Sequence, residues 1–272
     1  AIASGELEGN LNLAVKGIRV GETTVREVNF TTKGRETAMQ LALRISGGPV
    51  EGEVGVKGGL NRSTLDWKGS LTGTHFSTPA GRWAQKRDIA LDFRFADLTL
   101  GVGAHCWTND NAEVCLAQPM RLGRSGSAKV KLEKLDMAIL KPYLRRRDKV
   151  EGVVTGEADV DWDLDRASLP NVRVSLTGDG LKGQTRYQGI RFPVTLERLR
   201  LRAALVNGQA SAGVEVRPEG DGLITGSFTV DDLEGERRLG GRLTIEDVTP
   251  SLLKPFFELV NVDYAPLYGT VE

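Results

Sequence analysis

The clearest pattern in the chain is a strict alternation of residue types from Val154 to Asp165. Apolar or small residues occupy the even positions up to Leu164, whereas Thr155 and a series of acidic residues occupy the odd positions. Successive side chains of a β-strand point to opposite faces, while a helix repeats every 3.6 residues. The pattern therefore predicts a strand with one apolar face and one acidic face.

The same alternation recurs along most of the chain, from about Leu7 to Ile245. Turn-forming residues such as Gly47-Gly48-Pro49 separate the alternating runs. The interval from Thr72 to Arg87 is less regular. Its small and polar residues around Pro79 and Gly81 suggest a loop, and we assign no element to this interval. Together these runs predict an all-β chain.

At two places along the chain, the spacing of apolar residues changes from every second residue to the 3.6-residue period of a helix. Apolar residues from Leu135 to Leu144 have helical spacing, with Asp136 as a candidate N-cap and Pro142 as a residue that tightens or kinks the turn. We therefore expect short helices at about 135–145 and 249–259.

These two breaks align with one another and indicate an internal repeat. Residues 132–144 match residues 245–257, with a shared Lys-Pro at 141–142 and 254–255, an offset of 254 − 141 = 113. Repeats of strands separated by one helix are typical of elongated bodies. We expect repeat units of roughly 1–149 and 150–272 within one continuous structure.

Composition excludes some classes of protein. Lys and Arg number 36, as do Asp and Glu, so the balanced charge gives no basis for binding nucleic acid. The chain contains no run of about 18 apolar residues, so the sequence predicts no membrane-spanning helix. Residues 1–10 do not resemble a signal peptide. We expect the chain to be a segment of a longer protein.

The two cysteines, Cys106 and Cys115, flank a polar, turn-forming segment. They can form a disulfide across a hairpin or remain free thiols. A zinc site with His105 would need four ligands, and the other histidine, His75, is distant in the sequence. A disulfide would place the chain in an oxidising compartment.

Recognisable catalytic motifs are absent from the sequence. A calcium-binding EF-hand loop starting at Asp159 would need Gly and Glu where Leu164 and Pro170 stand. Stacked Asp159, Asp161 and Asp163 on a parallel β-helix would suit a polysaccharide-acting enzyme, but a solvated acidic strand face is the simpler interpretation. We predict no enzymatic activity, cofactor or metal.

A basic run at Arg198, Arg200 and Arg202 alternates with leucines. If this strand lay beside the acidic strand, cross-strand ion pairs would fix the register of the two strands. Otherwise the arginines form a solvated face that discourages aggregation.

The predicted apolar faces exceed what two short helices can cover. They can cover one another in a sandwich, or stay open and bind a long apolar ligand. Small residues on these faces favour the open form because they would leave width between facing sheets: Gly9, Gly52, Gly69, Gly156, Gly226 and Gly241. The expected lining of such a groove is Val154, Ala158, Val160, Trp162, Leu164, Leu199, Leu201, Leu205, Val214, Val216, Phe228, Val230, Leu243 and Ile245.

Four segments resemble the TamB family, which is related to AsmA-like proteins, in order and spacing over about 104–259. They are the cysteine block at 105–116, the segment GRSGSAKV at 123–130, LDMAILKPYL at 135–144 and GEADVDW at 156–162. The resemblance implies a β-taco, a sheet folded lengthwise around an apolar groove. We therefore expect residues 1–272 to be a fragment of one elongated, solenoid-like β-taco.

The resemblance also implies a function. It predicts a periplasmic conduit that carries phospholipid between the inner and outer membranes, and a role in outer-membrane protein assembly with the barrel subunit TamA. The family's inner-membrane anchor and its partner-binding end would lie outside these residues. An alternative is a chaperone-like scaffold that binds the β-strands of outer-membrane proteins without conducting lipid.

Overall fold

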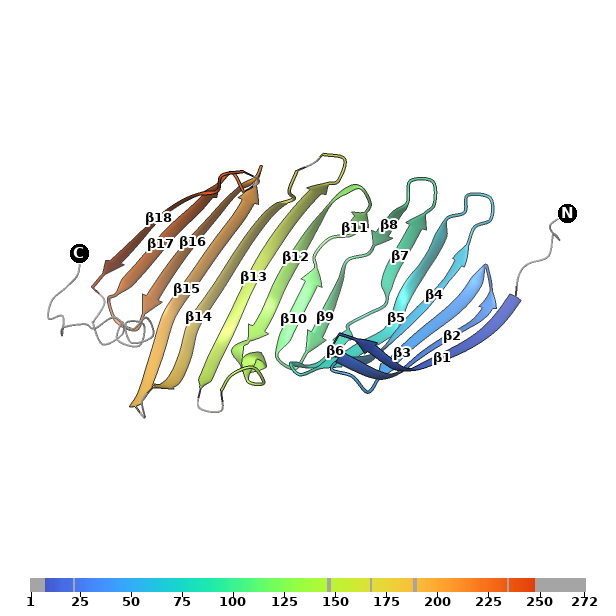
Figure 1. The fold of residues 1–272 in the computed structure, drawn as a ribbon, viewed down its shortest axis with the longest axis horizontal. Coiled ribbons are helices and arrows are strands. Elements are labelled where there is room, and N and C mark those ends of the chain that lie inside the picture. The colour runs from blue at the N-terminus through green and yellow to red at the C-terminus, as the bar shows by residue number, and fades with distance from the viewer. Residues whose placement is uncertain are drawn as a thin grey trace. The chain divides into compact units, whose positions relative to one another are not determined.

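The computed structural model describes residues 8–21, 23–145, 148–166, 168–187, 190–233 and 235–247. These residues form eighteen β-strands and one short 3₁₀ helix (Figure 1). Every pair of strands with an assigned register is antiparallel, so the expected all-β class is confirmed. The chain divides into two compact units: residues 1–130 with 163–165, and residues 131–162 with 166–272.

The first unit is a sheet of mostly short strands. Its elements are β1 (Glu8–Val20), β2 (Thr23–Arg35), β3 (Ala38–Ser46), β4 (Glu51–Leu60), β5 (Trp67–Thr78), β6 (Gly81–Gln85), β7 (Ile89–Arg94), β8 (Thr99–Val102), β9 (His105–Asn109), β10 (Ala112–Leu116), β11 (Met120–Leu122) and the first part of β12 (Ser125–Asp136). Strands β1 to β5 pair in chain order. β5 then pairs with β7 along its first half and with β6 along its second half.

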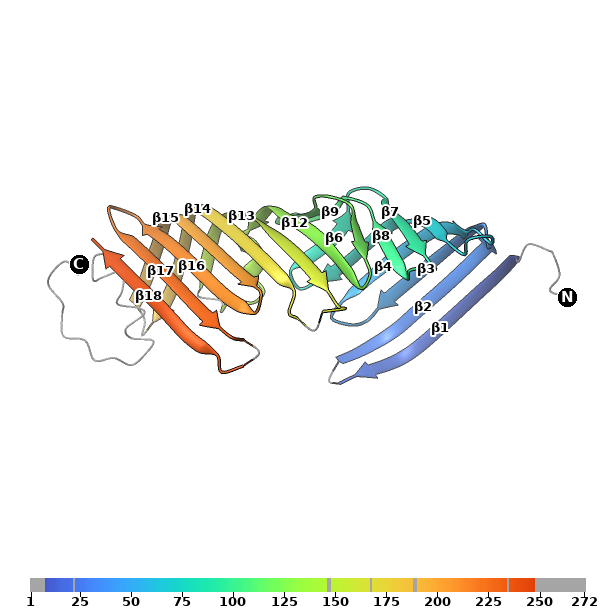
Figure 2. The ribbon, with the colours of Figure 1, turned by 90° about the horizontal axis from the view of Figure 1, so that it is seen from above.

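The second unit is a meander of longer strands. Its elements after β12 are η1 (Met137–Leu140), β13 (Lys149–Asp163), β14 (Asn171–Tyr187), β15 (Ile190–Val206), β16 (Gln209–Pro218), β17 (Leu223–Asp231) and β18 (Arg238–Glu246). Strands β13 to β18 pair successively, each antiparallel to the next, and lie side by side in chain order (Figures 1 and 2).

The prediction of a helix at 135–145 is wrong for most of that range. β12 continues to Asp136, and only Met137–Leu140 is helical, as a single 3₁₀ turn. Asp136 does cap it, because its carboxylate accepts a 2.9 Å hydrogen bond from the backbone N–H of Ala138. Pro142 lacks a backbone N–H and cannot extend the hydrogen-bonded turn. The expected helix at 249–259 lies outside the described residues.

Residues 72–87, to which the sequence assigns no element, form most of a β-hairpin. β5 extends to Thr78, a tight turn follows, and β6 occupies Gly81–Gln85. The turn is closed by Thr78, whose hydroxyl donates to the carbonyl of Gly81 and accepts from the backbone N–H of Ala80. Small and polar side chains obscured the alternation here, although Phe76 and Trp83 pair across the two strands.

Few apolar side chains are buried in the described part of the chain. They are Ile89, Ala112, Cys115 and Leu116 in the first unit, and Ile139, Val154 and Leu181 in the second. No helix among the described residues is long and apolar enough to cross a membrane. Much of the apolar surface of each sheet is therefore only partly covered.

Candidate functional site: an apolar sheet face

Strands β13 to β18 align their apolar residues into four rows that run across the sheet. The row containing Val154, for example, passes through Gly178, Leu199, Val216, Ile224 and Ile245. The other rows begin at Gly156, Ala158 and Val160 on β13 and also cross all six strands. Residues opposite one another in antiparallel strands point to the same face. The rows therefore form one continuous surface, here called the apolar face.

The apolar face has 24 registered positions, and each is Gly, Ala, Val, Leu, Ile or Phe. By row, they are Val154, Gly178, Leu199, Val216, Ile224 and Ile245; Gly156, Leu176, Leu201, Val214, Gly226 and Leu243; Ala158, Val174, Ala203, Ala212, Phe228 and Gly241; and Val160, Val172, Leu205, Ala210, Val230 and Leu239.

The opposite face of the same strands is polar and carries ion pairs. Asp179 pairs with Arg198 at 3.2 Å. Glu215 receives Arg200 at 3.8 Å and Arg217 at 3.2 Å. Exposed pairs of this kind contribute little stability individually, but they fix which face meets water.

The acidic strand and the basic strand are not neighbours. β14 lies between β13 and β15, so Asp159 stands opposite Arg173 of β14, not opposite an arginine of β15. The arginines of β15 meet Asp179 and Glu215 instead. The parallel β-helix that an enzyme with stacked carboxylates would require is contradicted by the antiparallel pairing of β13 and β14.

The third row of the apolar face has the smallest side chains. Ala158, Ala203, Ala212 and Gly241 fill four of its six positions. A cavity of about 440 Å³ opens over the third and fourth rows, from β14 to β17. Its lining is Val172, Val174, Ala203, Ala204, Leu205, Ala210, Ser211, Ala212, Phe228 and Val230.

Large side chains of this face remain in contact with solvent. Phe228 is 49% exposed, Leu243 58% and Leu239 83%. By contrast, Val154 is only 7% exposed. Apolar surface left open over several strands is a mark of a binding surface.

Twelve of the fourteen residues expected to line a groove lie in these rows. Trp162 is on β13 but lies beyond the last registered pair, Asp161 with Asn171. Leu164 follows the end of β13, is 70% exposed and does not belong to the apolar face. Its backbone N–H donates to the carbonyl of Arg124, because the chain turns there.

The expected lining omits twelve of the 24 positions of the apolar face, and the omitted residues include valine, leucine and isoleucine as well as glycine and alanine. Gly178, Ala203 and Ala212 occupy central positions in the rows. The alternation of Val172, Val174 and Leu176 could have been extended to Gly178, which continues the same face. The pairing register is what shows these residues to be part of the surface.

Inward glycines are covered by neighbouring side chains rather than leaving width between facing sheets. A side chain at Gly69 or Gly58 would collide with the indole of Trp67. A side chain at Gly226 would lie 2.9 Å from Val214 and 3.1 Å from Phe228. Gly9 differs, since nothing lies within 4 Å of its Cβ position. At Gly58, Gly69 and Gly226, then, glycine lets larger side chains lie flat on the sheet.

An aromatic cluster occupies the apolar side of the first unit. Phe76 lies 6.3 Å from Trp83 and 5.4 Å from Trp107, measured between ring centroids. His105 meets Trp107 edge-on and has one ring nitrogen 2.7 Å from the carbonyl of Gly103.

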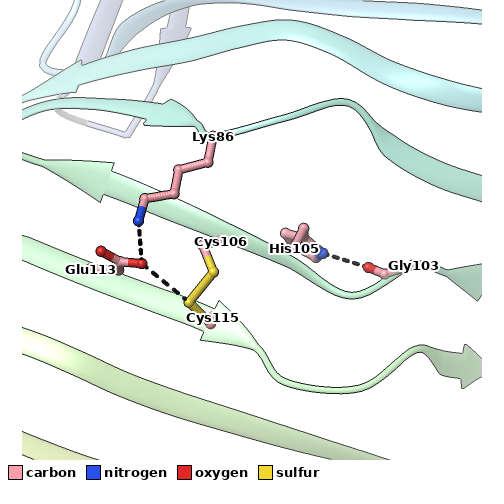
Figure 3. The surroundings of a disulfide bond; sticks show 6 residues. All are labelled: Lys86, Gly103, His105, Cys106, Glu113 and Cys115. Atoms are coloured by element: carbon pink, nitrogen blue, oxygen red, sulfur yellow. Dashed lines mark hydrogen bonds and ion pairs between the residues drawn. A yellow bond between two sulfur atoms is a disulfide. The ribbon is translucent and has the colours of Figure 1, made fainter.

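Cys106 and Cys115 form a disulfide between β9 and β10 (Figure 3). They are direct cross-strand partners with Cα atoms 4.0 Å apart. Glu113 lies on the same face, 2.5 Å from the ammonium of Lys86 and 3.7 Å from the sulfur of Cys115. Glu113 and the two sulfurs are close enough to hold a metal, but disulfide sulfurs are not thiolates and do not suit one.

Two ion pairs of the first unit shift pKa values. The hydrogen bond from Arg44 holds the pKa of Glu53 below its usual value, and the same bond raises the pKa of Arg44. The guanidinium of Arg44 lies 2.8 Å from the carboxylate of Glu53. Arg124 has a raised pKa because it is hydrogen-bonded to Asp165. None of these groups belongs to the apolar face.

Comparisons with known proteins identify the family of the chain. A relative from Haemophilus influenzae, the translocation and assembly module subunit TamB, is 23% identical over 245 residues. That match covers 90% of the chain but 19% of the relative, so the chain spans about a fifth of its length. No solved structure matches the chain. The model of the TamB N-terminal domain matches residues 2–262, and the chain therefore belongs to the TamB family.

Proposed function

We propose that the apolar face of β13 to β18 binds the acyl chains of phospholipid, and that the whole protein conducts phospholipid between the inner and outer membranes. The observation that carries this proposal is the set of four uninterrupted apolar rows. Six strands at about 4.8 Å spacing make each row about 24 Å long. Each methylene removed from water on such a surface contributes about 0.8 kcal/mol.

The chemistry of the face favours acyl chains over protein strands. A peptide laid on it would bury backbone N–H and C=O groups with no partner, at a cost of several kcal/mol per group. A strand would instead bind along a sheet edge, where backbone hydrogen bonds are offered. The uniformly apolar rows therefore support lipid conduction more than the alternative of a scaffold for outer-membrane protein strands.

The disulfide supports a periplasmic location. Disulfides persist in oxidising compartments such as the bacterial periplasm, and the Cys106–Cys115 bond closes a hairpin of the first unit. The inner-membrane anchor that we propose for the whole protein would lie outside these residues.

The relative's name supports a wider role. It describes a subunit of a translocation and assembly module. We propose that the whole protein acts with an outer-membrane barrel subunit such as TamA, bound outside the region described here, in assembling outer-membrane proteins.

A pair of substitutions, one on each face of the sheet, tests the lipid path. Ala203 lines the cavity of the apolar face, whereas Thr225 of β17 stands opposite Glu215 on the polar face and does not line that cavity. Ala203→Arg places a charge on an apolar path. The cost is about 2.5–3.5 kcal/mol, which corresponds to a loss of roughly 100-fold in the affinity of that position for an acyl chain. We expect Ala203→Arg in the whole protein to slow phospholipid exchange between the membranes, measured by lipid labelling.

Thr225→Arg is the control, since it introduces the same side chain on the opposite face. It should leave phospholipid exchange unchanged. Equal exchange in the two variants, with both proteins folded and expressed, would refute the proposed lipid path.

A further inference from the structure

The apolar face continues to the end of the sheet where β13 begins. A bulge between Glu151 and Val153 shifts the register there. Leu181 is buried and covers Gly152 and Gly178, so its side chain lies on the apolar side. Val150 stands opposite Gly183, two residues beyond Leu181 on β14, and therefore lies on the same side.

A cavity of about 570 Å³ lies beside Val150, between η1 and the first residues of β13. Ala138, Leu144 and Val150 form its apolar wall. η1 is held in place by the buried side chain of Ile139. The backbone N–H of Leu144 donates a 3.1 Å hydrogen bond to the carbonyl of Leu140 at the end of η1. Figure 1 shows η1 beside the starting end of β13.

The rim of this cavity is basic. Lys141, Arg145 and Lys149 line it and are exposed, and within the described residues no ion pair involves any of the three. Asp148 and Glu151 are the carboxylates of the lining. Glu151 stands opposite Lys182 on β14, and these two residues alternate with Val150 and Gly183 along their strands. In the sequence, residues 141–149 contain five basic residues and one acidic residue.

We propose that this rim binds the phosphate of a phospholipid headgroup whose acyl chain enters the apolar face past Val150. The proposal rests on the proposed function and adds the headgroup chemistry and the place where a lipid is anchored. Cations grouped around an apolar opening complement an amphiphile that carries a phosphate on a hydrocarbon tail. The binding of phosphate by lysine and arginine is electrostatic and should weaken with salt.

Three soluble probes separate the contribution of the headgroup to binding from that of the tail: dodecyl phosphate, dodecyl maltoside and inorganic phosphate. The two amphiphiles are used below their critical micelle concentrations. We expect the chain to bind dodecyl phosphate about tenfold more tightly than dodecyl maltoside in low salt, as measured by isothermal titration calorimetry. The variant Lys141→Ala/Arg145→Ala/Lys149→Ala should lose this preference and still bind dodecyl maltoside as the unmodified chain does.

A control with the same change in net charge is Arg173→Ala/Arg202→Ala/Arg242→Ala, on the polar face of β14, β15 and β18. It should keep the preference for dodecyl phosphate. The proposal is overturned if the rim variant keeps the preference, if the control loses it, or if inorganic phosphate binds as tightly as dodecyl phosphate. Binding of both amphiphiles without preference would overturn only the headgroup site, whereas binding of neither would refute the proposed function itself.

Discussion

At the scale of single residues, the apolar surfaces depend on large side chains lying over glycines. The indole of Trp67 on β5 crosses Gly69 of its own strand and Gly58 of β4, which are cross-strand partners. Dense packing of this kind does not tolerate an added methyl group unless its neighbours move. Replacement of either glycine therefore affects the first unit even though neither position has a side chain of its own.

Gly58→Ala should destabilise the first unit by about 1–3 kcal/mol, because the new methyl group collides with the indole of Trp67 and with the backbone carbonyl of Lys68. The cost should fall in a Trp67→Leu background, where the indole is absent, as measured by a double-mutant cycle of urea unfolding. Gly9→Ala is the control and should be within about 0.5 kcal/mol of the unmodified chain, since nothing lies within 4 Å of its Cβ position. Equal costs in both Trp67 backgrounds would show that the indole is not the cause.

The lowered pKa of Glu53 predicts a pH-dependent contribution to stability. Its carboxylate is favoured in the folded state by the hydrogen bond from Arg44. A carboxyl group with a lowered folded pKa stabilises the fold above its unfolded pKa of about 4.3, and this stabilisation is lost as pH falls through the folded pKa.

Glu53→Gln should therefore be less stable than the unmodified chain at pH 7 and equally stable at a pH below the folded pKa. Urea unfolding at a series of pH values measures the difference. If the stability of Glu53→Gln stayed below that of the unmodified chain by the same amount down to the lowest pH, the charge of the Glu53 carboxylate would not be the cause of the difference.

At the scale of elements, the β9–β10 hairpin is joined twice, by its ladder and by a disulfide. The two cysteines are nine residues apart in the sequence, so the bond closes a short loop. A loop of about ten residues loses about 2–3 kcal/mol of unfolded-state entropy on cross-linking.

The variant Cys106→Ser/Cys115→Ser should lower the opening free energy of the β9 and β10 amides by about 2–3 kcal/mol, measured by hydrogen exchange. Reduction of the unmodified chain with dithiothreitol should have the same effect, and should not alter the variant. Unchanged protection in the double variant would mean that the ladder alone holds the hairpin.

The sequence predicted those elements whose alternation is carried by large side chains. β13 and β15 follow directly from valines and leucines that alternate with charged residues. β6 was missed because Pro79 and Gly81 mark the turn more strongly than Trp83 marks the strand. The segment from Leu135 was misread because leucine and isoleucine at helical spacing also suit the end of a strand followed by one tight turn.

The sequence predicts which side of each strand is apolar, but it does not predict that these sides join into one continuous surface. Alternation assigns Val154, Leu199 and Val216 to the apolar sides of their own strands. Only the register shows that these residues fall in one row, because register depends on turns and bulges such as that between Leu196 and Arg198. The basic rim was missed because Lys141 and Arg145 fall in the segment expected to be a helix at about 135–145.

At the scale of the whole molecule, each unit presents an apolar sheet surface with little covering among the described residues. In the second unit the rows cross six strands without a polar residue, while the opposite face carries the ion pairs. This two-sided arrangement, together with membership of the TamB family, is the basis for proposing a lipid path.

The most direct test of this account is photo-crosslinking at two adjacent residues of β15. A photoreactive amino acid at Leu201 would stand on the second row of the apolar face, and at Arg202 it would stand on the polar face. With the chain expressed in the bacterial periplasm, the account predicts phospholipid attached at Leu201 and none at Arg202, identified by mass spectrometry. Phospholipid at both positions equally, or at neither position of a folded chain, would contradict the claim that the apolar face binds lipid.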